Sequence, residues 1–263
     1  MDALDRFLEE DGVGWRDVTS NLVAGHDAEA NLITREDGVA AGLEEATAVF
    51  DRLDVDAIAA VEDGDRVAEG DRLLEVAGDA AALLQGERLA CNLVASMSGI
   101  ATATRACVDR AGDVRVAATR KTTPGYRAFE KRAVRLGGGD PHRYNLADAV
   151  LIKENHIAVL GLETAVERAR ERASFTAKIE VEVETREQAE RATAAGADIV
   201  LLDNMTPGEV RECVHALHGD VLTEASGGIT PENVDEYAGT GVDVVSMGSL
   251  TYASNWLDVS MLV

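Results

Sequence analysis

The sequence predicts an α/β protein in which an N-terminal α+β sandwich domain precedes a (β/α) barrel of six to seven parallel strands. Beyond Val114, short apolar runs alternate with amphipathic helical stretches, an order typical of a parallel sheet covered by helices. At 57–80, apolar and polar residues instead alternate around Asp-Gly and Glu-Gly turns, which indicates antiparallel hairpins. We therefore expect domains at 1–112 and 113–250, with the tail at 251–263 joining the first domain.

Six apolar runs are the expected barrel strands: 114–122, 148–156, 176–185, 197–204, 220–228 and 242–249. Helical patterns occur at 43–53, 81–110, 157–173, 186–195, 206–218 and 231–239. Two helices begin with Thr-Pro, at Thr206 and Thr230, where threonine is the N-cap and proline occupies the first helical position. Six strand–helix units favour a closed barrel over an open sheet.

The charge balance is strongly acidic. With 48 acids, 25 bases and a net charge of −23, nucleic-acid and anionic-membrane partners are not expected. Such a surface suits concentrated salt, where screening removes self-repulsion, and activity lost in molar KCl would contradict this hypothesis. No apolar run approaches the ~18–20 residues of a membrane span, and the acidic N-terminus is unlike a secretory signal, so a cytoplasmic protein is expected. The three scattered cysteines indicate neither a disulfide framework nor a zinc site.

The basic residues are concentrated in one region. Between Arg115 and Lys153 there are nine bases and three acids, a balance of +6 in an otherwise acidic chain. All four lysines of the protein lie between Lys121 and Lys178. A solvated basic helix is one explanation of this region, but a site for anions is favoured.

Polar and glycine residues follow the expected strands, where the loops of an α/β barrel converge on substrates. These residues are Arg120, Lys121, Thr122, Lys153, Asp203, Ser226, Gly227, Gly228 and Gly248. The glycines in EASGGIT (224–230) and VSMGS (245–249) allow close backbone approach, and free N–H groups at a helix start attract phosphate. The glycine-rich segment 136–150, which carries His142 and Arg143, is interpreted as a loop that covers the substrate.

The run at 176–185 predicts a charged row inside the barrel. Side chains alternate between faces, so Lys178, Glu180, Glu182 and Glu184 share one face, and the intervening apolar residues should meet the helices. Buried carboxylates cost several kcal/mol per unpaired ion. They are therefore expected to pair with cationic residues of neighbouring strands or with a metal-bound substrate.

A resemblance to one family is carried by GDRVAEGDRLLEVAG, GERLACNLVASMSGIATATR (86–105), TRKTTPGYRAFEKRAVRLGGGDPHRYNLADAVLIKENH (119–156), IEVEVET, DIVLLDNM, EASGGIT and VDVVSMGSLT. Nearly end to end, the chain resembles the quinolinate phosphoribosyltransferase family, also called nicotinate-nucleotide pyrophosphorylase (carboxylating). One departure is RDVTS at 16–20, where Arg16 stands in place of the family's usual glycine.

The resemblance implies a reaction in NAD biosynthesis that joins quinolinate to 5-phosphoribosyl 1-diphosphate. The products would be nicotinate mononucleotide, pyrophosphate and carbon dioxide. Magnesium would accompany the diphosphate, and no organic cofactor is implied. The resemblance also implies a homodimer or higher homo-oligomer in which each active site is completed by the neighbouring subunit.

The resemblance also implies the site residues. The substrate-binding set is Arg88, Arg120, Lys121, Thr122, His142, Arg143, Lys153, Glu182, Asp203, Ser226, Gly227, Gly228 and Gly248. The catalytic residues within it would be Lys121, Lys153, Glu182 and Asp203. Arg88 would contact a quinolinate carboxylate in the partner's site, and Glu182 and Asp203 would hold the ribose hydroxyls and magnesium. Lys178 and Glu180 would lie behind these residues.

Two alternatives remain open. A related phosphoribosyltransferase with another acceptor would keep the fold, although the cationic set favours a dicarboxylate. A non-catalytic protein that binds a phosphorylated ligand would keep the phosphate loops, but it has no reason to keep the acidic row.

Overall fold

The computed structural model describes residues 2–14 and 17–263, so Arg16 lies outside the described residues. The chain divides into two compact units. The first contains the chain up to residue 105 together with 123–138 and 254–263, and the second contains 106–122 and 139–253. This division differs from the expected boundaries mainly at 123–138, which belongs to the first unit.

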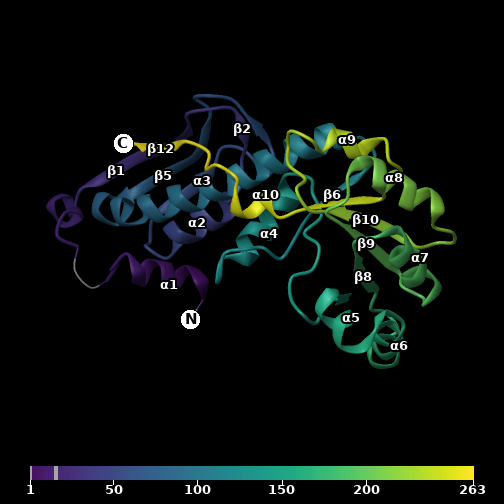
Figure 1. Cartoon of the computed structure of the whole chain (residues 1–263). Coiled ribbons are helices and arrows are strands. Elements are labelled where there is room, and N and C mark those ends of the chain that lie inside the picture. Colours follow the sequence, from purple (N-terminus) through teal and green to yellow (C-terminus); the bar gives the residue numbers. More distant parts are fainter. Residues whose placement is uncertain (1, 15–16) are drawn as a thin grey trace. The chain divides into compact units, whose positions relative to one another are not determined.

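The first unit contains an antiparallel sheet with the strand order β12-β1-β5-β3. Its strands are β1 (Asp27–Thr34), β3 (Asp56–Ala59), β5 (Arg72–Asp79) and β12 (Val259–Leu262), and a small second sheet pairs β2 (Gly38–Val39) with β4 (Arg66–Val67). The antiparallel pairing of β3 with β5 agrees with the alternating pattern at 57–80. The C-terminal strand pairs with β1, with Asn31 opposite Leu262 (Figure 1).

The helices of this unit cover the sheet. They are α1 (Ala3–Glu10), η1 (Ser20–Val23), α2 (Leu43–Asp51), most of α3 (Ala80–Ala111) and α4 (Arg127–Leu136). Phe50 of α2 and Leu83 of α3 pack against the buried face of β5 in one core cluster. The tail runs close to α3, where a Cβ on Gly99 would lie 2.0 Å from the carbonyl oxygen of Asn255. Only glycine fits there.

The second unit is built on six parallel strands in the order β6-β11-β10-β9-β8-β7. The strands are β6 (Arg115–Ala118), β7 (Val150–Ile152), β8 (Ile179–Val183), β9 (Ile199–Asp203), β10 (Leu222–Ser226) and β11 (Val244–Met247). The first strand pairs with the last, as in a barrel, which agrees with the predicted fold class.

The expected closed ring of strands is open at one seam. Among the described residues, no ladder joins β6 to β7. The connection between them, 119–149, enters the first unit as α4 and returns, and a single bridge between Ala117 and Asp140 ties it to β6. Because this long connection forms α4 in the first unit, it does not place β7 directly beside β6.

Helices alternate with these strands and lie along the sheet (Figure 1). They are α5 (Glu154–Leu160), α6 (Leu162–Arg172), α7 (Arg186–Ala194), α8 (Pro207–Ala216), α9 (Asp235–Ala238) and α10 (Ser249–Tyr252). The single helix expected at 157–173 is two helices, because Gly161 adopts φ 78° between them. Thr206 caps α8 as expected, with its hydroxyl accepting a hydrogen bond from the N–H of Glu209. Within the described ranges, no helix is both long and apolar enough to cross a membrane.

Candidate active site

The strand register places a row of acidic residues inside the barrel. Glu182 of β8 pairs with Leu201 of β9, which pairs with Glu224 of β10, so these three side chains share a face. The apolar residues of β8, which are Ile179, Val181 and Val183, are buried, and α6 and α7 pack against this strand. The charged face predicted for this strand is therefore the inner face.

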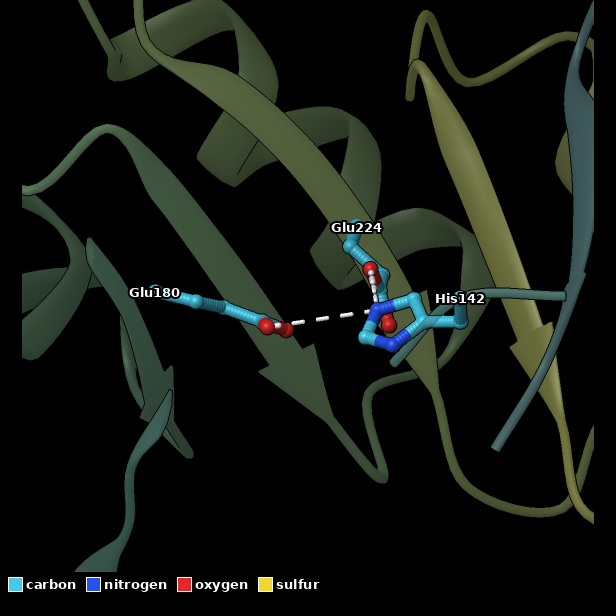
Figure 2. Close-up of side chains that lie close together, drawn as sticks. All are labelled: His142, Glu180 and Glu224. Carbon is cyan, nitrogen blue, oxygen red and sulfur yellow. Dashed lines mark hydrogen bonds and ion pairs between the residues drawn. The ribbon is translucent and has the colours of Figure 1, made fainter. Parts of the chain in front are cut away.

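A histidine lies between two buried carboxylates in the barrel interior. The His142 Nε2 atom is 3.1 Å from a carboxylate oxygen of Glu224 and 3.9 Å from one of Glu180. Figure 2 shows the two carboxylates pointing toward the imidazole ring from different strands. Glu180 is 2% exposed and Glu224 is 3% exposed. A hydrogen on Nε2 would therefore be donated to a carboxylate oxygen of Glu224.

Burial dominates the electrostatics of this cluster. The pKa of Glu180 is raised to about 7, first by burial and then by the charge of Glu224, while His142 and Arg143 act in the opposite direction. Burial also lowers the pKa of Arg143, against the stabilising charge of Glu180. Among the described residues, the Nε atoms of Arg120 and Arg143 are buried without a hydrogen-bond partner. Buried acids and buried cations thus compensate one another's charge.

Metal binding is one possibility for the same three residues. Donor atoms of His142, Glu180 and Glu224 lie within 4.8 Å of one another. However, Nε2 already contacts Glu224 at hydrogen-bonding distance, and the charge of Arg143 partly compensates the carboxylates. We therefore interpret the cluster as an ionic network.

The shifted pKa of Glu180 makes a prediction about stability. A carboxyl group with a raised folded-state pKa favours the folded protein below its ordinary value of 4.5 and loses this contribution as the pH rises through about 7. We expect a loss of about 3 kcal/mol over this range, which Glu180→Gln removes. Urea unfolding between pH 4.5 and 8 measures it, with Glu184→Gln, at the exposed end of the strand, as the control. If the free energy of unfolding changed with pH in the same way for wild type and Glu180→Gln, the prediction would be wrong.

A second group of charges lies at the carboxyl ends of β7, β8 and β9. The Lys153 ammonium donates a hydrogen bond to Glu182. Burial and the charge of Glu182 raise the pKa of Asp203, while Lys153 and Lys121 lower it. The side-chain amide of Asn204 donates to Asp203 at 2.7 Å. The charge of Glu182 beside Asp203 disfavours a second negative charge at this position, so the pair favours an additional cation.

Glycines form a tight corner after β10 and β11. Gly227 and Gly228 have φ of 92° and 65°, conformations that favour glycine. The N–H of Asn204 donates to the carbonyl of Ser226 at 2.8 Å and joins the ends of β9 and β10. At Gly248, a Cβ would lie 2.8 Å from Cδ of Lys121, so that lysine lies across the glycine.

A cavity of about 540 Å³ lies at the seam of the barrel. It is lined by Arg120, Arg143, Leu146, Ala147, Ala149, Val150, Leu151, Lys153, His156, Arg172, Ala173, Ser174 and Ala177. None of these lining residues is acidic, although the chain has a net charge of −23. Three of the predicted basic residues, Arg120, Arg143 and Lys153, therefore line one pocket.

The other predicted residues occupy different places. Thr122 lies in the loop after β6, where its N–H donates to the carbonyl of Arg120, and Lys178 precedes β8. Arg88 belongs to the first unit, on α3, with its side chain 70% exposed and its guanidinium 3.8 Å from Glu87. The second unit does not contain it.

The sequence interpretation missed three residues of this region. The sequence contained a signal for Glu224: in the run 222–226 it shares one strand face with Leu222 and Ser226, just as Glu180 and Glu182 share one face of β8. His156 stands in the KENH segment, where its Nδ1 accepts a hydrogen bond from the N–H of Lys153 at 3.0 Å. Arg172 ends a highly charged helix and had no distinguishing signal.

These features define an α/β-barrel enzyme with a cationic pocket, a carboxylate pair and glycine corners at the carboxyl ends of its strands. Residues 17–98 match the family model of the quinolinate phosphoribosyl transferase N-terminal domain, and residues 100–262 match that of the C-terminal domain. The chain belongs to the quinolinate phosphoribosyl transferase family.

Relatives cover almost the whole chain. The probable nicotinate-nucleotide pyrophosphorylase (carboxylating) of Methanothermobacter thermautotrophicus is 46% identical, across 99% of this chain and 98% of that protein. The human nicotinate-nucleotide pyrophosphorylase (carboxylating) is 41% identical, across 98% and 89%. The crystal structure of NadC from Streptococcus pyogenes matches with a TM-score of 0.94 at 41% identity, covering 100% of this chain and 95% of that one.

Proposed function

We propose that this protein transfers the phosphoribosyl group of 5-phosphoribosyl 1-diphosphate to quinolinate. The products are nicotinate mononucleotide, pyrophosphate and carbon dioxide, in the pathway to NAD. The observation that carries the proposal is the cavity beside Arg120, Arg143 and Lys153, which has no acidic lining residue in a strongly acidic chain. A pyridine dicarboxylate matches such a pocket, because the forked guanidinium group of arginine suits carboxylates.

The acceptor side of the site is assigned from this cavity. Arg120 and Arg143 bind the two carboxylates, and their unpartnered Nε atoms supply donors. His142 stands beside Arg143, on the barrel interior. Lys121 and Lys153 lie between the ring and the diphosphate, and Thr122 supports the loop between them. Arg88 of a neighbouring subunit completes the pocket in a homodimer or larger homo-oligomer.

The donor side is assigned to the acidic and glycine residues at the strand ends. Ser226, Gly227, Gly228 and Gly248 bind the 5-phosphate through their backbone N–H groups. The remaining pair, Glu182 and Asp203, contacts the ribose hydroxyls and magnesium.

Magnesium fits this carboxylate pair. Magnesium prefers carboxylate oxygens, usually one or two of them together with substrate phosphates. Burial and the neighbouring Glu182 raise the pKa of Asp203, and a divalent cation would offset both effects. When bound, the ion neutralises charge on the diphosphate as it leaves.

The residues of the chain account for the rest of the chemistry. Departure of pyrophosphate leaves a sugar with oxocarbenium character, which Glu182 and Asp203 stabilise electrostatically. The ring nitrogen of quinolinate bonds to this sugar carbon and becomes a ring cation. One ring carboxylate then leaves as carbon dioxide, and its electron pair stays on the ring carbon, where the ring cation and Arg120 and Arg143 stabilise it. That carbon then takes up a proton from water. No protein nucleophile is needed.

A product assay tests the proposal. The purified protein is incubated with 5-phosphoribosyl 1-diphosphate, magnesium and either quinolinate or nicotinate, and nicotinate mononucleotide and carbon dioxide are measured. We expect product and carbon dioxide from quinolinate alone. Product from nicotinate only would identify a paralogue with another acceptor, and binding without turnover would identify a ligand-binding protein.

We further propose that the enzyme works in the cytoplasm and without a nucleic-acid partner. The net charge of −23 disfavours binding to phosphate backbones. The same acidity suits concentrated salt. Activity measured from dilute buffer to molar KCl tests this adaptation.

A further inference from the structure

The His142 backbone adopts an unusual conformation where the chain returns to the barrel. Its φ is 52°, a left-handed value that costs energy in a residue with a Cβ. The preceding Asp140 is tied to β6, with its N–H donating to the carbonyl of Val116 at 2.8 Å and its carbonyl accepting from the N–H of Ala118 at 3.0 Å. The Asp140 carboxylate also accepts from the His142 N–H at 2.7 Å. The backbone of His142 is thus fixed against the seam.

The imidazole ring is held from the opposite side of the barrel. A carboxylate oxygen of Glu224, on β10, lies at hydrogen-bonding distance from Nε2, 3.1 Å, and Glu180, on β8, lies 3.9 Å from the same atom (Figure 2). The strand between them, β9, contributes Leu201 to the same face, opposite Glu224. Side-chain contacts from two strands and backbone contacts from β6 together fix the ring.

The two glutamates have no direct role toward the proposed substrates. Both substrates are anions, and both carboxylates are almost completely buried. A buried carboxylate beside an anion pocket would repel an anionic ligand unless a neighbouring cation compensated the carboxylate's charge. Here the neighbouring basic side chains are His142 and Arg143, the latter a residue that lines the pocket.

We propose that Glu224, supported by Glu180, is a positioning residue for the acceptor: it fixes the His142 imidazole so that the dicarboxylate meets a preorganised donor set. The proposal deepens the proposed function and rests on it. Glu224 acts through His142 and does not touch substrate. Its loss should therefore weaken the binding of quinolinate and leave the binding of 5-phosphoribosyl 1-diphosphate unaffected.

Steady-state kinetics of two Glu224 variants test this role. We expect Glu224→Ala to raise KM for quinolinate at least tenfold while KM for 5-phosphoribosyl 1-diphosphate changes less than twofold. Glu224→Gln keeps the accepting oxygen and nearly the same shape, so it should restore quinolinate KM to within about threefold of wild type. An equal rise in both KM values, or no rescue by glutamine, would overturn the proposal.

A double-mutant cycle asks whether Glu224 acts through His142. If it does, the double variant His142→Ala/Glu224→Ala should have the same KM for quinolinate as His142→Ala alone. The reason is that Glu224 has no further effect on quinolinate binding once His142 is removed. Additive losses would instead show an independent role for Glu224.

An NMR measurement separates this proposal from the proposed function. The chain has five histidines, so the imidazole ¹⁵N signals of His142 are assigned by their absence in His142→Gln. In substrate-free protein we expect a hydrogen-bonded, protonated Nε2, whose shift moves in Glu224→Ala and returns toward wild type in Glu224→Gln. An unchanged signal would overturn the positioning role, whereas a changed signal without quinolinate turnover would refute only the choice of substrate.

Discussion

Arg88→Ala is expected to lower kcat/KM for quinolinate by about 100- to 1000-fold while leaving the melting temperature unchanged. The side chain is 70% exposed, and its ion pair with Glu87 spans 3.8 Å, so its removal costs the folded chain little. A forked, charge-assisted contact to a substrate carboxylate is worth about 3–4 kcal/mol in a desolvated site, which corresponds to the predicted loss. Steady-state kinetics and thermal unfolding of the same preparation measure both quantities.

Mixing inactive variants tests whether Arg88 acts in a neighbouring subunit. Arg88→Ala and Lys153→Ala each lack a different part of the proposed site. If Arg88 crosses between subunits, mixed oligomers contain some sites with both residues intact, and part of the activity should return. If subunit exchange is demonstrated by mass spectrometry and activity does not return, the shared-site proposal is wrong.

The alternation of charged and apolar residues along the strands was the local sequence pattern that best predicted the site. In β8 it correctly separated Glu180 and Glu182 from the buried apolar residues between them. The partners of Glu180 could not be read in the same way. His142 comes from a loop and Glu224 from a strand two positions away in the sheet, so this contact depends on the tertiary fold.

The helix α4 shows what composition alone does not predict. Its basic residues belong to the region for which an anion site was favoured over a solvated basic helix. In the structure, Lys131 is fully buried, and Glu130 is 2% exposed with its carboxylate accepting from the N–H of Thr123. Buried charged residues are exceptional, and their partners are not visible in a local pattern.

The open seam escaped prediction for a related reason. Strand–helix alternation indicates how many strands a barrel has, but it does not show where a long connection travels. Because 123–138 belongs to the first unit, the connection does not place β7 beside β6, and no ladder joins these two strands in the part of the chain that the structure describes. The cavity is lined by Arg120, which follows β6, and by Val150 and Leu151 of β7. The cavity in which we propose that the acceptor binds therefore lies at this seam.

Gly227→Ala should be the most damaging change at the proposed phosphate corner. An alanine Cβ would lie 2.2 Å from Oδ1 and 2.8 Å from the backbone nitrogen of Asn204, at a φ of 92°. Asn204 cannot easily move, because its N–H bonds to Ser226 and its side chain to Asp203. We expect the free energy of unfolding to fall by about 2–4 kcal/mol, from overpacking and left-handed strain together. Affinity for magnesium 5-phosphoribosyl 1-diphosphate should fall about 100-fold, because the displaced loop carries Asp203 with it.

The adjacent glycine provides the matched control. Gly228 has φ 65°, but a Cβ there would meet no atom within 4 Å. Gly228→Ala should therefore cost only the conformational strain, about 1–2 kcal/mol, and should weaken donor binding much less. Urea unfolding and titration calorimetry on both variants measure the difference. Equal losses would mean that strain alone matters, and that the close approach of Gly227 to Asn204 does not hold the donor site together.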